Sequence, residues 1–357
     1  MQVIKQNILI SLIVCLMVSC GGGDKQDSED KEVLNPGLSG KFFMSTNTLL
    51  NAAFGDYVEI PDTCDQGLTE EFSQARDTST YPIQQNGEWF IFVAREGGRS
   101  YICVQSFSGD VIFDVELPVE VELVNLSQDG AYLAVTRSSD GESLEADLLE
   151  IYTIEGVALG STSLGSGYSN MSYVYWLRDN RLVYHKGRSF FITKPALMEV
   201  DYQIDLDDYE LLPDTGRFIN HWAISPDDRR IAFTLTRDLF TTDVIQLLVM
   251  DLDGSNLTVQ ATVTDEGDGY VVFYPLWSPD GEWIFTEVGI QPMIKPYKFT
   301  YFYLIPANNP DTHYLIDEDD EERSPEIRKV WRKRQVTEYG EEITSEGFWF
   351  DWLYWLP

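Results

Sequence analysis

Histidine, the side chain that most often binds a metal or transfers a proton near neutral pH, is scarce in this sequence. The three histidines are His185, His221 and His313. They fall in well-separated segments, with no close pair of the kind that places two ligands on one metal. We therefore expect three unrelated histidines and no metal or other cofactor. A metal-dependent polysaccharide lyase or hydrolase, with histidines converging on one point, is the alternative.

Two further motifs that could do chemistry are weak. No Gly-x-Ser-x-Gly nucleophile elbow is present, so serine catalysis of that type is not expected. The segment 251–256 places Asp, Asp and Asn at alternate positions, as a calcium loop does, but it lacks the later bidentate Glu. The same residue types are needed for a hairpin turn, which we favour. We expect no catalytic residue and hence a protein that is not an enzyme.

Opposite charges gather in residues 317–334. Six consecutive acidic residues at 317–322 precede a basic group at 328–334. A solvated insertion is the default for such runs. The functional alternative is a docking patch, which would make the chain an accessory subunit of a larger complex.

A tight-turn motif recurs five times and indicates how the chain is organised. Its fourth position falls at Gly87, Gly130, Asn180, Asp228 and Gly281, with spacings of 43, 50, 48 and 53 residues. In each copy a short apolar segment leads into the turn and a β-rich segment follows it. Repeats of this length are typical of propeller blades.

The fourth repeat shows most clearly how many strands each unit contains. Its segment 244–250 is almost continuously apolar, which is typical of a strand buried on both faces. A second turn at 251–254 leads to a further strand at 257–263. Four antiparallel strands per repeat predict an all-β fold, a β-propeller of four-stranded antiparallel blades.

The best-preserved copies of the repeat resemble those of TolB-type β-propellers. They are Ser225-Pro226-Asp227 with Ile231-Ala232-Phe233, Met250-Asp251-Leu252-Asp253-Gly254, and Trp277-Ser278-Pro279-Asp280-Gly281. The resemblance covers roughly residues 84–316. It implies a periplasmic propeller that binds other proteins or envelope components, and it implies no substrate, because propellers host many functions.

The number of blades follows from the two terminal segments that the five repeats do not include. Repeats begin near residues 84, 124, 173, 219 and 271, and neither the segment 41–60 nor the segment 330–357 is a whole blade. We expect both termini to build one closing blade, with the aromatic tail 348–355 as its innermost strand. The prediction is six blades, with seven as the alternative, in a single domain, 38–357, that has almost no helix.

Propeller ligands often bind where the loops between second and third strands, and the loops leading to the next blade, surround one mouth of the channel. These loops are expected at residues 95–99, 138–145, 237–242, 265–270 and 289–297. Within or beside them, His221, Arg237, Tyr270 and Tyr274 are the candidate ligand-binding residues.

The N-terminus has the features of a bacterial export signal. Lys5 precedes an apolar run from Ile8 to Val18, which is too short to span a bilayer. The run ends in Met17-Val18-Ser19-Cys20, which resembles the lipobox of lipoproteins. We expect a signal peptide at 1–19, lipidation of Cys20 and a flexible tether at 20–37. The resemblance implies a membrane-anchored protein that faces the periplasm, with the outer membrane favoured over the inner and the cell surface as an alternative.

Cysteine usage follows from that location. Of the four cysteines, Cys15 would leave with the signal and Cys20 would carry lipid. Cys64 and Cys103 then remain as a pair in an oxidising compartment, so we expect a disulfide bond between them.

The charge balance limits the class of partner. Lys and Arg number 25 against 59 Asp and Glu, for a formal net charge of −34. Nucleic acid is disfavoured, because phosphate binding needs a positive field. We therefore expect a non-enzymatic binding scaffold whose partners are envelope proteins or envelope polymers, with membrane contact through Cys20. The oligomeric state is left open.

Overall fold

The computed structural model describes residues 41–44, 48–51, 57–59, 64, 77–82, 89–139, 147–164, 174–194, 198–210, 212, 218–236, 245–264, 275–289, 300–309, 312–317, 324–330, 332–337, 340–344 and 353–356. All of them belong to one compact unit, 33–357. Strands dominate these residues, and η1 (Leu206–Asp208) is a single 3₁₀ turn. The predicted all-β class is confirmed.

Three four-stranded sheets follow one another in the first half of the chain, and consecutive strands pair antiparallel in each. The first contains β4 (Asp77–Pro82), β5 (Trp89–Glu96), β6 (Arg99–Ser106) and β7 (Val111–Leu117). The second contains β8 (Leu123–Leu126), β9 (Tyr132–Arg137), β10 (Leu148–Thr153) and β11 (Ala158–Ser163). The third contains β12 (Val174–Trp176), β13 (Leu182–Lys186), β14 (Ser189–Thr193) and β15 (Val200–Asp205).

Two more sheets follow in the second half of the chain. One contains β16 (Phe218–Ile224), β17 (Arg230–Thr236), β18 (Ile245–Asp251), β19 (Thr258–Thr264) and, at its edge, β23 (Tyr314–Asp317). The other contains β20 (Leu276–Trp277), β21 (Trp283–Gly289), β22 (Thr300–Pro306) and β24 (Arg328–Lys329). A separate hairpin is formed by β25 (Arg332–Thr337) and β26 (Gly340–Thr344).

The remaining sheet joins the two ends of the folded unit. Its order is β27-β1-β2-β3, from β27 (Leu353–Leu356), β1 (Lys41–Met44), β2 (Thr48–Asn51) and β3 (Tyr57–Glu59). Strand β27 pairs antiparallel with β1, with Trp355 opposite Phe42. The C-terminal aromatic segment is therefore a strand beside the N-terminal one.

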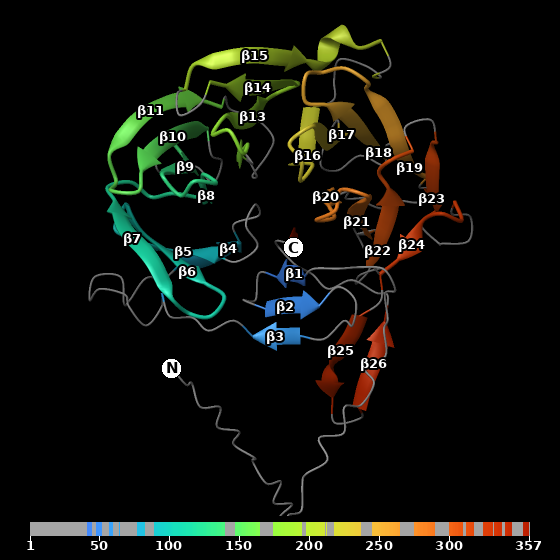
Figure 1. The fold of residues 1–357 in the computed structure, drawn as a ribbon, viewed down its shortest axis with the longest axis horizontal. Coiled ribbons are helices and arrows are strands. Elements are labelled where there is room, and N and C mark those ends of the chain that lie inside the picture. The colour runs from blue at the N-terminus through green and yellow to red at the C-terminus, as the bar shows by residue number, and fades with distance from the viewer. Residues whose placement is uncertain are drawn as a thin grey trace, which may run out of the picture. The chain divides into compact units, whose positions relative to one another are not determined.

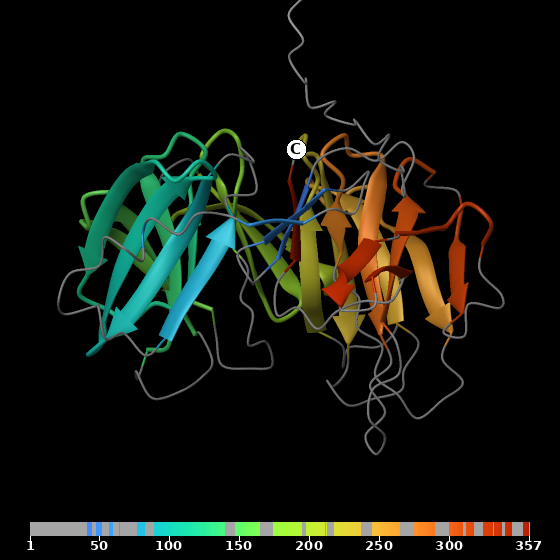
Figure 2. The same cartoon turned by 90° about the horizontal axis from the view of Figure 1, so that it is seen from below.

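Within the unit 33–357 the sheets follow one another around a common centre in chain order (Figure 1). The first strands β4, β8, β16 and β20 lie nearest the centre, and the last strands β7, β11 and β15 lie at the perimeter. Figure 2 shows the sheets from the side, with the strands running between two faces. This arrangement is that of a β-propeller.

The core consists of apolar layers between neighbouring sheets. Ile91 and Val104 of one sheet pack with Leu126 and Leu133 of the next in a single buried cluster. Equivalent clusters lie between each later pair of sheets as far as β22. Because strands such as β17 and β18 bury residues on both faces, their sequences are almost continuously apolar.

The turn between the first and second strands has the same geometry in four sheets. Its fourth residue has a positive φ: 71° at Gly130, 62° at Asn180, 59° at Asp228 and 72° at Gly281. L-residues rarely adopt such values, and glycine, asparagine and aspartate do so most readily. The repeated Gly, Asn or Asp of the sequence is thus explained by the backbone.

The last repeat departs from the prediction for residues 317–334. Strand β23 leaves its own repeat and pairs in parallel with β19 of the preceding sheet, with Ala261 opposite Tyr314. Strand β24 takes the fourth position instead, and Arg328 lies over the ring of Trp283 at 5.4 Å. The solvated-insertion prediction is therefore wrong for its basic part, which forms strands in a sheet and in the β25–β26 hairpin. The acidic residues 318–322 lie outside the described residues.

Candidate functional site

In the turns between first and second strands, side chains form hydrogen bonds with the backbone N–H groups of the same turn. These bonds make the turns rigid. In the β16–β17 turn, the Ser225 hydroxyl donates to Asp227 at 2.6 Å and accepts from the Arg230 N–H at 2.9 Å. Asp227 also accepts from the Arg229 N–H at 3.2 Å. The same pattern recurs in the β8–β9 and β20–β21 turns, around Ser127 and Ser278.

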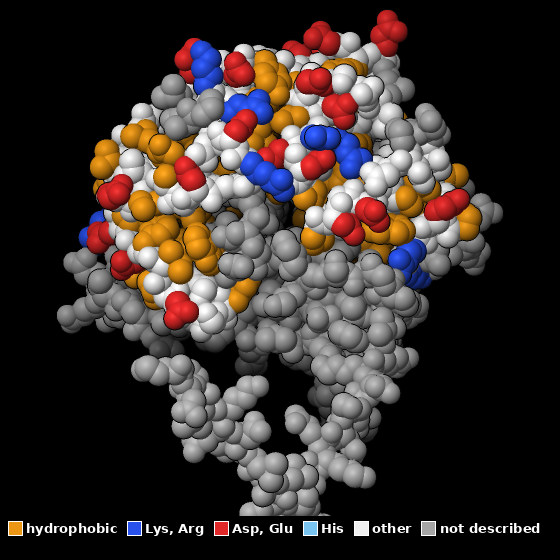
Figure 3. Space-filling model, in the orientation of Figure 1, with side chains coloured by type: hydrophobic (Ala, Val, Ile, Leu, Met, Phe, Trp, Pro, Cys, Tyr) orange, Lys and Arg blue, Asp and Glu red, His pale blue; other side chains and the backbone are white. Residues whose placement is uncertain are grey.

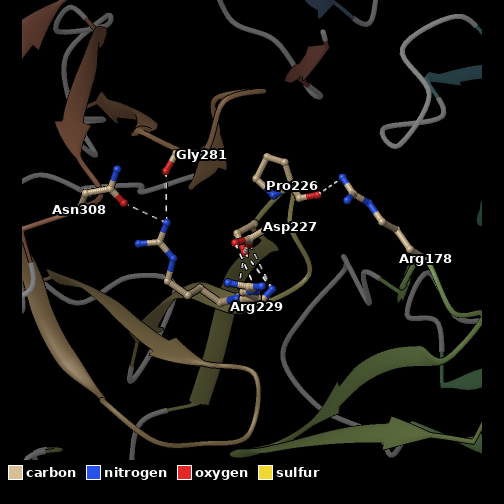
Figure 4. A network of polar contacts seen from close by, with 8 residues as sticks. Arg178, Pro226, Asp227, Arg229, Gly281 and Asn308 are labelled. Atoms are coloured by element: carbon tan, nitrogen blue, oxygen red, sulfur yellow. Dashed lines mark hydrogen bonds and ion pairs between the residues drawn. The ribbon is translucent and has the colours of Figure 1, made fainter.

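Neighbouring turns are also bonded to each other. The amide of Asn180 donates to Asp129 of the preceding turn at 2.5 Å. The backbone N–H of Arg178 donates to Asp228 of the following turn at 2.7 Å, and its guanidinium donates to the carbonyl of Pro226. Figure 4 shows Arg178 reaching Pro226 from a different sheet. The turns thus form a hydrogen-bonded chain across three sheets.

Arg230 continues this chain to the next sheet. Its guanidinium donates to the carbonyls of Ala307 at 2.7 Å and Gly281 at 3.2 Å, and to the side-chain oxygen of Asn308 at 3.2 Å. It also lies 4.6 Å from the centre of the Trp277 ring, where the π face attracts a cation. One side chain therefore joins β17 to the turn, the first strand and the end of the third strand of the next sheet.

Indole groups make a second set of bonds between sheets. Trp176 and Trp277 occupy the same position before their turns. Each donates its ring N–H to a carbonyl of the preceding first strand, Trp176 to Asn125 at 3.1 Å and Trp277 to Ala223 at 3.2 Å. These bonds hold neighbouring inner strands in a defined register.

A pocket of about 330 Å³ opens on this turn face. It is formed by three consecutive turns and the end of β22, and its walls are mostly charged or polar. The lining residues are Arg178, Pro226, Asp227, Arg230, Pro279, Asp280, Gly281, Glu282 and Asn308. In Figure 3, basic and acidic side chains lie side by side over β16 and β17 on the face that Figure 1 also shows. The arrangement can bind a polar ligand through charge and hydrogen bonds.

The carboxylates of the turns are held in different electrostatic states. Burial opposes ionisation of Asp227, but bonds from Ser225 and the Arg229 N–H, with the nearby arginine charges, lower its pKa overall. Burial raises the pKa of Asp228, although the bond from the Arg178 N–H and the charge of Arg178 oppose this. The pocket therefore keeps Asp227 firmly ionised beside two guanidinium groups.

Two of the three histidines share one buried region. His185 on β13 and His221 on β16 are 8% and 7% exposed, and the His185 ring packs against Trp222, the residue that follows His221 in β16. Burial lowers the pKa of His185 to about 4. Burial, followed by the charge of His185, lowers the pKa of His221 to about 3. Both are therefore neutral at physiological pH.

The third histidine lies elsewhere. His313 is exposed and its ring lies 2.6 Å from the Thr262 hydroxyl, next to β23. In the part of the chain that the structure describes, no group of three His, Cys, Asp or Glu side chains is arranged to hold a metal ion. The expectation of three unrelated histidines is therefore wrong for His185 and His221, which share one buried region, whereas His313 lies at the surface.

The loop face predicted to bind a ligand is only partly described. Arg237, Tyr270 and Tyr274 lie outside the described residues. The fourth candidate, His221, lies within β16, and its side chain is buried, so it does not belong to a loop.

The described ionisable residues of that loop face include Arg95, which is buried, and Glu122, whose pKa is raised. The Arg95 side chain is buried and donates to the carbonyls of Val121 and Glu122. Burial, partly offset by Arg95, raises the pKa of Glu122 to about 7. Arg95 therefore fastens the loop that leads into β8.

The segment 251–256 is a hairpin turn between β18 and β19. The Asp253 carboxylate accepts from the Ser255 N–H at 2.9 Å and from its hydroxyl at 2.6 Å, while Asp251 accepts from Asn256 at 2.6 Å. Gly254 has a φ of 87°. The carboxylates are occupied by the turn itself, which is the interpretation that the sequence favoured over a calcium loop.

Cys64 and Cys103 are joined by a disulfide bond, with their Cα atoms 5.9 Å apart. Cys103 lies on β6, the third strand of its sheet. The N–H of Cys64 also donates to the Gln105 side chain at 2.7 Å. The segment containing Cys64 is thereby fastened to a buried strand. Cys20 lies outside the described residues.

The pocket on the turn face was missed from the sequence. Its residues belong to the repeated turns, which were interpreted only as connections between strands. A signal was present, since Arg178, Arg181, Arg229 and Arg230 come from two turns of a chain that is otherwise poor in basic residues.

In the described residues, no helix has the length and apolar character needed to cross a membrane.

Comparison with known proteins gives structural similarity but no family. No protein-family model and no curated protein matches the chain. The chain is similar to TolB from Acinetobacter baumannii (12% identity, TM-score 0.42, covering 76% of this chain and 61% of that one). It is also similar to a protein from Lactobacillus plantarum (12%, 0.43, 82% of each chain) and to a GH74 enzyme from Niastella koreensis (11%, 0.41, 78% of this chain and 46% of that one).

The chain spans less than two thirds of the TolB and GH74 structures. At these identities and TM-scores the similarity assigns neither a family nor an activity. The propeller description therefore rests on the sheets of the chain itself.

Proposed function

We propose that this chain is a non-enzymatic envelope lipoprotein, anchored through lipid on Cys20, whose propeller binds a partner through the turn face. The binding site comprises the pocket and the turns that line it. The observation that carries the proposal is the bonding between neighbouring turns, from Asn180 and Asp129 to Arg230 and Gly281. A surface held in this way loses little conformational freedom on binding.

The fold supports the same role. We propose six blades, the sixth formed by β27 beside β1, β2 and β3, so that the termini close the ring. Strand β27 pairs with β1, and Trp355 lies opposite Phe42 in this pair. Closure by both termini resists separation of the ends, which suits a scaffold that must keep its turns in register.

The lipid anchor and the periplasmic location complete the proposal. They rest on the apolar run that ends at Cys20 and on the charged stretch that follows it. A tether of this composition would let the propeller stand clear of the membrane surface and reach envelope proteins.

Capture from crosslinked envelopes tests the proposal. The full-length chain should retain a defined set of envelope proteins, and the double variant Arg178→Gln, Glu282→Lys should lose them. Arg181→Gln is the matched control, because this arginine belongs to the same turn as Arg178 but pairs with Asp179 at 2.8 Å and does not line the pocket. Equal capture by the double variant and the control would contradict a role for the turn face.

A further inference from the structure

Charges of both signs line the pocket, and they come from three different turns. Arg178 comes from the β12–β13 turn, whereas Asp280 and Glu282 come from the β20–β21 turn. The β16–β17 turn lies between them, and Figure 4 shows Arg178 and Gly281 on opposite sides of Pro226. The pocket therefore has the Arg178 guanidinium at one end. At the other end the carboxylates of Asp280 and Glu282 lie near the Arg230 guanidinium, whose hydrogen bonds go to Gly281, Ala307 and Asn308.

The Arg178 guanidinium at the basic end has more N–H donors than its hydrogen bond to Pro226 uses. Among the described residues its hydrogen-bond partner is the carbonyl of Pro226. This bond directs the side chain and leaves further N–H groups that can bind a carboxylate in parallel. The backbone carbonyl carries no compensating charge, and the nearby Asp228 carboxylate offsets the positive charge only in part, so the guanidinium can attract a ligand anion.

The carboxylates of Asp280 and Glu282 at the acidic end have oxygen atoms that can accept further hydrogen bonds. One oxygen of Asp280 accepts from the Ser278 hydroxyl and from the Glu282 N–H, the latter at 3.0 Å. The Glu282 side chain is exposed and lines the pocket. A ligand ammonium or guanidinium can bind these carboxylates.

The neutral and central residues suit a peptide backbone. Asn308 offers an amide N–H group, since its oxygen is the atom bonded to Arg230. Pro226 and Pro279 give the walls a rigid apolar surface. A volume of about 330 Å³ is at the lower end of the range for ligand pockets, and it suits a short segment with few side chains.

Single-sign ligands fit the pocket poorly. A phosphate group would face Asp227, Asp280 and Glu282 together, and a purely basic segment would face Arg178 and Arg230. We infer that the pocket binds a short peptide segment of a partner protein that carries an acidic and a basic side chain, the carboxylate at Arg178 and the cation at Asp280 and Glu282. This inference rests on the proposed function, because it names the ligand chemistry of the turn face.

Titration calorimetry of the full-length protein with four probes tests the inference. The probes are acetyl-Glu-Lys-Glu-Lys-amide, acetyl-Glu-Glu-Glu-Glu-amide, acetyl-Lys-Lys-Lys-Lys-amide and inorganic phosphate. The mixed peptide should bind saturably and more tightly than the other three. Arg178→Gln should weaken its binding about tenfold, the loss expected for one charge-assisted bidentate contact, while Arg181→Gln should leave it unchanged.

A second variant keeps the test independent of folding. Glu282→Lys changes an exposed side chain and should transfer the preference to the all-glutamate peptide, a gain that a misfolded protein cannot show. Equal binding of phosphate and mixed peptide by the wild type, equal effects of Arg178→Gln and Arg181→Gln, or no saturable binding of any peptide would each overturn the inference. Capture that depends on the pocket without peptide binding would remove this ligand class and leave the proposed function standing.

Discussion

Arg230 lies over the indole ring of Trp277 at 4.6 Å, so a residue at the start of β17 is held against the first strand of the next sheet. The same guanidinium bonds to two backbone carbonyls of that sheet. The contact joins two sheets through a turn that also lines the pocket. Arg230 therefore contributes both to the packing of the two sheets and to the lining of the pocket.

Arg230→Met should lower the free energy of unfolding by about 1 to 3 kcal/mol, because the substitution removes a cation–π contact and leaves carbonyls without their donor. Arg229→Met is the matched control, since the Arg229 side chain is 81% exposed and should change stability by no more than about 0.5 kcal/mol. Urea unfolding measures both. Equal effects of the two substitutions would contradict the role given to Arg230.

Gly281→Ala should destabilise the chain by about 1 to 2 kcal/mol, because alanine is strained at a φ of 72°. The nearest atom to an added Cβ is Pro226 Cδ at 3.8 Å, which is an ordinary contact, so the cost comes from the backbone. Thermal unfolding provides the measurement. An unchanged midpoint would show that this turn adopts another conformation in solution.

Loss of the Cys64–Cys103 disulfide should lower stability by about 3 to 4 kcal/mol in the chain-entropy model, since the bond closes a loop with a sequence separation of 39. The double variant Cys64→Ala, Cys103→Ala and the reduced wild-type protein should lose the same amount in denaturant unfolding. Labelling of the mature protein should find no free thiol at either position. Quantitative labelling before reduction would show that the bond does not form.

Acid should destabilise the protein through the buried histidine pair. The pKa values of His185 and His221 in the folded state, about 4 and about 3, lie below the unfolded value of 6.5. Below about pH 6.5 the unfolded chain binds protons that the folded chain does not. Stability present above that pH is therefore lost as pH falls towards 4, by about 1.4 kcal/mol per pH unit for each histidine.

The double variant His185→Phe, His221→Leu isolates this effect in urea unfolding from pH 7.5 to 4.5. The carboxyl of Glu122 acts in the opposite direction, because its pKa of about 7 lies above the unfolded value, so its contribution grows as pH falls. The variant should therefore lose much less stability on acidification than the wild type. Parallel pH profiles for the two proteins would refute the histidine account.

The turns show how far sequence reasoning reached. Gly130 and Gly281 mark positive φ directly, and Asn180 and Asp228 could be placed beside them because they are the residues that best tolerate the same backbone. This local chemistry predicted the strands and the sheets. The bond from Arg178 to Pro226 crosses 48 residues of sequence and depends on how sheets stack, which no local pattern encodes.

Two placements depend on contacts between sheets. The apolar residues 314–316 indicate a strand but do not say which sheet edge it joins, and β23 pairs with β19. His221 was a candidate ligand-binding residue, and only the stacking of the sheets shows that its side chain is buried. Partner choice and burial between sheets are tertiary properties.

Position-resolved photo-crosslinking in intact envelopes is the most direct test of binding through the turn face. A benzophenone amino acid replaces Arg229, an exposed residue of the β16–β17 turn that does not line the pocket, or, as the control, exposed Asp201 on the outer strand β15 of the same protein. The proposal predicts a high-yield crosslink from position 229 to one partner protein, which Arg178→Gln reduces, and none from position 201. Equal yields at the two positions, or crosslinks from position 201 alone, would contradict it.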